Sequence, residues 1–284
     1  IGNPWLYLVF FGIVFVMLLI DFLGFKQKKA DEVPLKQALT WSIAWVTVAL
    51  LFAGGLWLYL QQTATLAIAN QKTMEYLAGY LLEKSLAIDN VFVWLMIFAA
   101  FAVPAGLQRK ILLYGVLGAI ILRSIFIFIG AWFVQEFSWV LYIFGAFLVY
   151  TGFKFLKGQG EEEQNIEDMK VLKWLRKHMR ITQNFHGDRF FIREQGVLWA
   201  TPLFIVLILV EFSDVIFAVD SIPAIFAVTT DPFIVLTANL MAILGLRAMF
   251  FLLAGAASKM HYLPYGLGII LLFIGFKMLM LDVF

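Results

Sequence analysis

Apolar positions along this chain fall into long continuous runs instead of alternating with polar ones. Runs of this length can cross ~30 Å of hydrocarbon as helices. The expected spans are residues 4–23, 39–60, 76–103, 111–134, 139–156, 197–222, 233–255 and 265–281. The first run is too long for a signal-peptide core and lacks a small-residue cleavage site, which predicts a retained helix. The pattern therefore predicts an all-α fold, a polytopic transmembrane helix bundle.

The amino-acid composition supports a membrane protein and excludes any site that depends on cysteine. Hydrophobic residues make up 63% of the chain and charged residues 14%, with a mean hydropathy of +0.91. A soluble domain is nearer half apolar and a quarter charged. The 284 residues include no cysteine, which excludes disulfides, thiolate metal sites and dithiol redox chemistry within them. We expect a lipid bilayer as the surroundings and no nucleic-acid partner, and the oligomeric state stays open.

Basic residues are concentrated in alternate loops between the expected spans. Connections after the first, third, fifth and seventh spans carry fifteen Lys and Arg residues, whereas the others carry only Lys72. The positive-inside rule then predicts a multi-pass membrane protein with its amino terminus outside.

The connection at 157–196 is the one sizeable polar segment, and we expect it in the cytoplasm. It begins with Glu161, Glu162 and Glu163 and continues into a basic stretch from Val171 to Arg180. Apolar residues among those charges leave two interpretations open. The basic stretch is either a short amphipathic helix on the cytoplasmic leaflet or a solvated loop.

Self-comparison predicts an internal repeat. The segment Glu83–Val91 aligns with Asp214–Ile222, Leu122–Phe126 with Leu246–Phe250, and Gly152–Lys154 with Gly275–Lys277. Three matches in order indicate that the third to fifth spans repeat as the sixth to eighth. Since three is odd, the copies have opposite topology, a common transporter plan with its site near the midplane. The expected organisation is two amino-terminal helices (1–75), a first three-helix repeat (76–156), the loop (157–196) and a second three-helix repeat (197–284).

Acidic residues inside spans are the main functional signal. Each costs about 2.5 kcal/mol or more at a helix centre, so a function is the default hypothesis, and a structural charge network is the alternative. Arg123, Arg247 and Lys84 are candidate counter-ions that would leave about two acids for one divalent cation. The acids are Glu83, Asp89, Glu211, Asp214 and Asp220.

Neutral oxygen donors accompany these acids. Asn90 and Ser221 directly follow the two repeated aspartates. Glu83 and Asp89 are rotated by about 120° on one helix, so sharing an ion would require a helix break between them. In the second copy Pro223 predicts such a break, which would free the Val219 carbonyl. The predicted metal site comprises Glu83, Asp89, Asn90, Glu211, Asp214, Asp220 and Ser221.

The ligand chemistry limits the metal. Carboxylates, an amide, a hydroxyl and a backbone carbonyl are hard donors that suit Mg²⁺, Ca²⁺ or Mn²⁺ better than copper or zinc. The three histidines, His178, His186 and His261, are predicted in loops, which disfavours zinc.

The two acidic repeats resemble the TerC family of bacterial membrane proteins, in particular its Alx-type members. The resemblance rests on Glu83–Asn90 and Glu211–Ala224 and continues through Thr229–Phe233 and Leu244–Ala248. It implies an inner-membrane protein linked to manganese export, in a family that is also associated with tellurite resistance and redox modulation. Similar proteins usually continue into a ninth span beyond the position of Phe284.

The expected function is export of Mn²⁺ as transported substrate, with no resident cofactor and no enzymatic activity, and with coupling to protons through a surplus carboxylate. One alternative is a non-transport membrane factor for assembly or metallation of other proteins. The other is a redox modulator, for which the sequence offers no thiol couple.

Overall fold

The protein is a multi-pass bundle of membrane helices. Its computed structural model describes residues 1–24, 34–157, 170–254 and 263–280. The long helices are α1 (Pro4–Gly24), α2 (Leu35–Thr63), α3 (Leu66–Ala100), α4 (Ala105–Glu136), α5 (Val140–Leu156), α7 (Pro202–Phe226), α8 (Pro232–Ile243), α9 (Leu246–Ala254) and α10 (Leu263–Leu279). Each expected span overlaps with helix over most of its described length. By length and apolarity alone, five stretches of the described residues could each cross a membrane, with α8 and α9 counted as one.

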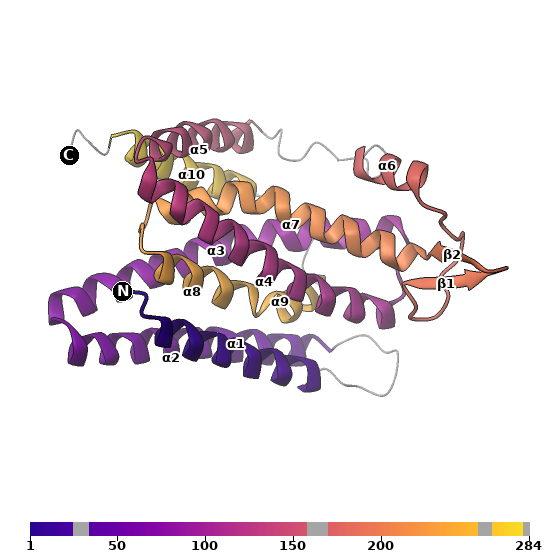
Figure 1. Ribbon diagram of the computed structural model, residues 1–284, viewed down its shortest axis with the longest axis horizontal. Coiled ribbons are helices and arrows are strands. Elements are labelled where there is room, and N and C mark those ends of the chain that lie inside the picture. Colours follow the sequence, from indigo (N-terminus) through magenta and orange to yellow (C-terminus); the bar gives the residue numbers. More distant parts are fainter. Residues whose placement is uncertain (25–33, 158–169, 255–262, 281–284) are drawn as a thin grey trace.

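The helices form three groups across the bundle. Figure 1 shows α1 and α2 on one side, α5 and α10 on the opposite side, and the remaining long helices between them. The stretch Pro232–Ala254 is the centre, because it is buried along its whole apolar window, whereas α1 is mostly exposed. α8 begins where Asp231 accepts a hydrogen bond from the Phe233 amide and Pro232 takes the first helical position. The apolar face of α1 that points outward is consistent with contact to lipid.

The expected span 233–255 is two helices. The helix stops at Leu244–Gly245 and resumes at Leu246. A Cβ on Gly245 would lie 2.9 Å from the Lys84 Nζ and 3.2 Å from the Trp45 Cβ, so glycine is needed for this close approach. Lys84 Nζ donates to the Ala242 carbonyl at 3.1 Å, which places a cation at the carboxyl end of α8. The expectation that Lys84 neutralises an acid is wrong, since among the ion pairs of the described residues none includes it.

The equivalent helices α5 and α10 pack through matching glycines. A Cβ on Gly152 would lie 2.9 Å from the Gly268 carbonyl oxygen. A Cβ on Gly275 would lie 2.8 Å from the Gly145 carbonyl oxygen. The repeat offset of 123 residues relates Gly152 to Gly275 and also Gly145 to Gly268. The two contacts are therefore reciprocal, as an internal two-fold axis would make them.

The first helices of the two predicted repeats, α3 and α7, run antiparallel. Gly79 lies near Ile225, whereas further along α3 the Trp94 indole donates to Ser213 at 3.3 Å. α5 and α10 are also antiparallel, because Gly145 faces Gly275 and Gly152 faces Gly268. Opposite directions of equivalent helices are what the predicted inverted topology requires.

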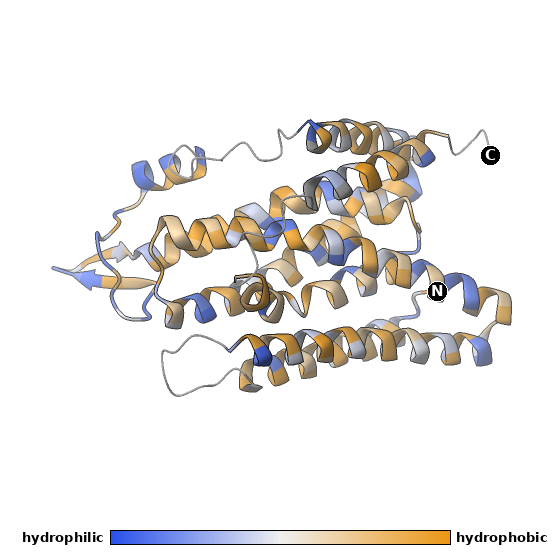
Figure 2. Ribbon diagram, turned by 180° about the vertical axis from the view of Figure 1, so that it is seen from behind, coloured by the Kyte–Doolittle hydropathy of each residue, from blue (hydrophilic) through white to orange (hydrophobic). Residues whose placement is uncertain are grey.

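The described part of the polar segment lies at one end of the bundle, together with the α3–α4 turn (Figure 1), and Figure 2 shows many hydrophilic residues there. α6 (Lys170–His178) confirms the amphipathic helix: Leu172 and Leu175 are buried and its basic residues are exposed. The acidic run 161–163 lies outside the described residues. The sequence did not predict the following hairpin, β1 (Phe191–Glu194) paired antiparallel with β2 (Val197–Ala200). The expected start of a span at residue 197 is therefore wrong, because these residues pair as a strand and α7 begins at Pro202.

Candidate cation site between α3 and α7

One arginine on α4 joins acids from both predicted repeats. The Arg123 guanidinium donates to the Glu83 carboxylate of α3 through Nη1. It also donates two hydrogen bonds to Asp214 of α7, from Nε to Oδ2 at 3.1 Å and from Nη2 to Oδ1 at 2.7 Å. All three side chains are at most 1% exposed. Glu83 and Asp214 are equivalent in the repeat alignment, so the prediction that Arg123 is a counter-ion is confirmed, with two acids as its partners instead of one.

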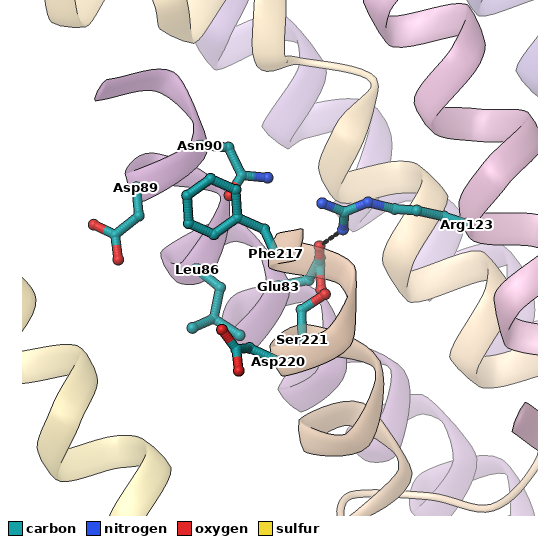
Figure 3. Close-up of a pocket in the computed structure, with 8 residues that line it drawn as sticks. All are labelled: Glu83, Leu86, Asp89, Asn90, Arg123, Phe217, Asp220 and Ser221. Carbon is teal, nitrogen blue, oxygen red and sulfur yellow. Dashed lines mark hydrogen bonds and ion pairs between the residues drawn. The ribbon is translucent and has the colours of Figure 1, made fainter. Parts of the chain in front are cut away.

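A small cavity adjoins this network. Its volume is ≈ 10 Å³, room for about one water molecule or one ion. The lining comes from α3, α4 and α7 and consists of Glu83, Leu86, Asp89, Asn90, Arg123, Phe217, Asp220 and Ser221. Figure 3 shows Arg123 on one side of this cavity, with the carboxylates of Asp89 and Asp220 on the other. Five of the seven predicted metal ligands therefore line a single cavity.

Three of the lining oxygens are buried without a hydrogen bond from the described residues: Glu83 Oε2, Asn90 Oδ1 and Ser221 Oγ. The Asn90 nitrogen donates to Asp214 Oδ1 at 3.3 Å, which leaves the amide oxygen for another contact. An unsatisfied buried polar atom costs about 1–3 kcal/mol. Twelve buried side-chain atoms of the described residues lack a hydrogen bond, and three of them gather beside this one cavity, where a bound ion would satisfy them.

Asp89 and Asp220 are equivalent in the repeat but differ in their surroundings. Asp220 accepts a hydrogen bond from the Thr151 hydroxyl of α5 at 3.3 Å. Asp89 receives no hydrogen bond or ion pair from the described part of the chain. Both side chains are only partly buried, in contrast to Glu83 and Asp214. The cavity thus has a buried side, where Arg123 offsets one of two negative charges, and a more accessible acidic side.

Glu211 does not line the cavity. Its carboxylate lies against α4 at Gly118, where an added Cβ would clash with the Glu211 carboxylate oxygens. Gly118 therefore does more than permit helix packing, because the space left by its missing side chain holds a carboxylate. Asp214 is also absent from the lining, although Arg123 links it to Glu83. The structure thus brings Glu83, Asp89, Asn90, Asp220 and Ser221 together and leaves Glu211 apart.

The predicted helix breaks are wrong. α3 is continuous from Leu66 to Ala100, yet Glu83 and Asp89 both line the cavity, because it extends along the helix. α7 also continues through Pro223 to Phe226. Pro223 lies in the last turn, where the loss of one amide donor is tolerated. The discontinuity is instead at Leu244–Gly245.

Arg247, the repeat equivalent of Arg123, has a different partner. It donates through Nη1 to Asp21 of α1 at 2.6 Å, beside a second cavity of ≈ 10 Å³ that Trp45 and Val116 also line. Asp21 is 7% exposed, and the sequence analysis missed it as an intramembrane acid. Its position within the expected span 4–23 was the available signal. Arg247 is thus a counter-ion, but for an acid outside the predicted site.

No group of three or more His, Cys, Asp or Glu side chains in the described residues is close enough to hold a metal ion as it stands. The cavity instead offers two carboxylates, Asp89 and Asp220, with one further oxygen each from Glu83, Asn90 and Ser221. This is a mixed oxygen set of the kind that hard divalent cations accept.

Comparison with known proteins identifies the family. The model of the integral membrane protein TerC family matches residues 68–284, which include every residue of this site. The chain belongs to the TerC family. The matched region contains α3–α10 and therefore both predicted repeats, whereas α1 and α2 precede it.

Close relatives of this TerC protein are bacterial. A protein of Photorhabdus laumondii is 58% identical over 99% of this chain and 88% of its own length. An Escherichia coli K12 protein is 57% identical with the same coverage, and both are named "Putative membrane-bound redox modulator Alx". An uncharacterized membrane protein of Myxococcus xanthus is 46% identical over 99% of this chain and 85% of its own length. No solved structure matches this chain.

Proposed function

We propose that this TerC protein transports a divalent metal cation across the bacterial inner membrane and exports Mn²⁺ from the cytoplasm through the cavity between α3 and α7. The observation that carries the proposal is the group of three buried, unsatisfied oxygens beside two aspartates in one cavity. Intramembrane acids are costly and therefore functional by default. The choice of manganese and the export direction come from the resemblance to the family.

Charge supports a divalent substrate. Arg123 offsets one of the two charges of Glu83 and Asp214, and no ion pair within the described residues neutralises Asp89 or Asp220. A cation bound among these groups would therefore be attracted by more than one negative charge in surroundings of low dielectric constant. Uptake of a proton by one of these acids when the cation leaves would provide the coupling, since protons and metal compete for the same carboxylate.

Arg123 has a distinct part in the proposed cycle. Its planar guanidinium presents several donors in a fixed geometry and can therefore bind two carboxylates together. It therefore stabilises Glu83 and Asp214 while the cavity holds no ion, and leaves Glu83 Oε2 facing the cavity as a ligand. This arrangement keeps the empty site folded without neutralising Asp89 and Asp220.

Flux into liposomes tests the proposal directly. Purified protein in liposomes that contain a Mn²⁺-sensitive dye should give a rapid signal after Mn²⁺ is added outside, and protein-free liposomes should not. A non-transport assembly factor would give the rate of the protein-free liposomes. The redox modulator named for the relatives would change a redox readout without moving the ion, and no thiol in these 284 residues is available for that chemistry.

A further inference from the structure

The Thr151 hydroxyl on α5 points toward α7 and not toward a carbonyl of its own helix. Several helical threonines donate to the carbonyl four residues earlier in their own helix, as Thr47 does to Ile43 and Thr63 to Tyr59, both at 2.8 Å. Thr151 instead donates to the Asp220 carboxylate of α7 at 3.3 Å, and the residue is 7% exposed. A threonine in a helix has a local acceptor at no cost. The cross-helix hydrogen bond therefore indicates a role at the site.

The glycine crossing of α5 and α10 determines where Thr151 lies. The next residue, Gly152, packs closely against the backbone of Gly268 and Leu272. A movement of α5 away from α10 would therefore break this packing contact. This packing keeps Thr151 within hydrogen-bonding distance of Asp220. Helix α5 thus reaches Asp220 through the Thr151 hydroxyl and through the nearby positive charge of Lys154.

The two halves differ at this point. The offset that relates Gly152 to Gly275 places Ile274 at the position equivalent to Thr151. Isoleucine has no hydroxyl, so the second repeat offers no matching donor to Asp89. One aspartate is therefore oriented before an ion arrives, and the other is free to turn.

We infer that Thr151 is a positioning residue that orients Asp220 as the ordered ligand for the transported cation, while Asp89 is the ligand that moves. This inference rests on the proposed function. The Thr151 hydroxyl donates to Asp220 Oδ1, which leaves Oδ2 without a hydrogen bond from the described residues. Partners that orient a metal ligand are commonly worth about 10–100-fold in metal affinity.

Mn²⁺ binding to the purified protein tests this inference, with loss of the EPR signal of free Mn²⁺ as the readout. The Thr151→Val variant keeps the shape and removes the donor, and we expect its Kd to rise about tenfold. Thr151→Ser restores the donor and should bind close to wild type. Thr47→Val makes the same change on an exposed face of α2 and should leave the Kd unchanged.

The outcomes separate the two proposals. If the wild type does not bind Mn²⁺, the proposed function and this inference both fail. If the wild type binds and Thr151→Val binds equally well, only the inference is overturned. Weak binding by both Thr151→Val and Thr151→Ser would also overturn it, because the hydroxyl would then not be the determinant. Melting temperatures of all variants check that the folded fraction is the same.

Discussion

Glu83 on α3 and Asp214 on α7 share one counter-ion, the Arg123 guanidinium, although 131 residues separate them in the sequence. They are also equivalent positions in the predicted repeat. Asp89 and Asp220, and Asn90 and Ser221, are further equivalent pairs, and all four line the cavity beside Arg123. Three pairs of equivalent residues thus meet at one place, as expected for a site between inverted repeats.

Neutralising either cavity aspartate should abolish Mn²⁺ flux. Asp220→Asn and Asp89→Asn each remove one charge and keep the size of the side chain. Loss of an intramembrane charge lowers the cost of insertion, so lost flux would not reflect failed insertion. Proteoliposome flux and membrane expression are measured for both variants. Asp188→Asn is the control, because this exposed acid lies near Lys110 outside the site.

Wild-type flux in Asp220→Asn would remove that residue from the site. Loss in only one of the two variants would show that the site lies within one half and that the repeat is architectural.

Removing the shared counter-ion should destabilise the protein. Arg123→Met leaves Glu83 and Asp214 buried without their cation, and removing one partner of a buried charge network costs about 3–5 kcal/mol. The melting temperature in detergent should fall accordingly. The triple variant Arg123→Met, Glu83→Gln, Asp214→Asn should recover most of the loss, because replacing a whole buried network is often nearly neutral. A single variant as stable as wild type would contradict this account of the network.

The ion pair between Asp21 and Arg247 should contribute far more to stability than an exposed pair. It links α1 to α9 across a distance of 2.6 Å, and both side chains are at most 10% exposed. Asp21→Asn should cost about 3 kcal/mol. At the exposed pair, a hydrogen bond from Lys110 and its charge hold the pKa of Asp188 below its usual value. Disrupting such an exposed pair should cost much less, because solvent screens the two charges. If disrupting either pair lowered the melting temperature by the same amount, the ion pair between Asp21 and Arg247 would not anchor α1.

The α5–α10 crossing should be sensitive at both equivalent glycines. Gly152→Ala and Gly275→Ala would place a Cβ within 2.8–2.9 Å of backbone atoms of the partner helix, so the helices must separate. Both variants should unfold at lower temperature and by similar amounts. At Gly54, where an added Cβ meets nothing within 4 Å, alanine should be neutral or stabilising by about 0.5–1 kcal/mol. A large effect at only one of the two glycines would argue against a two-fold crossing.

The sequence predicted the spans and most of the cavity because both depend on local signals. Long apolar runs mark helices, and an acid within such a run is conspicuous wherever the chain folds. The hairpin also had a signal that was overlooked: Gln195 and Gly196 form a two-residue turn with positive φ between two short apolar strands.

The sequence could not predict which charged side chains pair with one another across the bundle. Three cations were available to the acids, and nothing local indicates that Arg123 binds two acids while Lys84 binds a carbonyl at a helix break. The separation of Glu211 from the cavity likewise depends on the space at Gly118, which only the packing of α4 against α7 creates. The break at Pro223 was wrong because a proline in the last helical turn removes only one hydrogen bond.

Anomalous scattering from Mn²⁺-soaked crystals tests the central claim most directly, because it locates the ion independently of any activity. We predict a peak in the cavity between α3 and α7, about 2.0–2.6 Å from oxygens of Asp89 and Asp220 and close to Glu83, Asn90 or Ser221. The peak should disappear in Asp220→Asn. Crystals of the wild type with no peak in this cavity, or with peaks only at surface acids, would contradict the proposal.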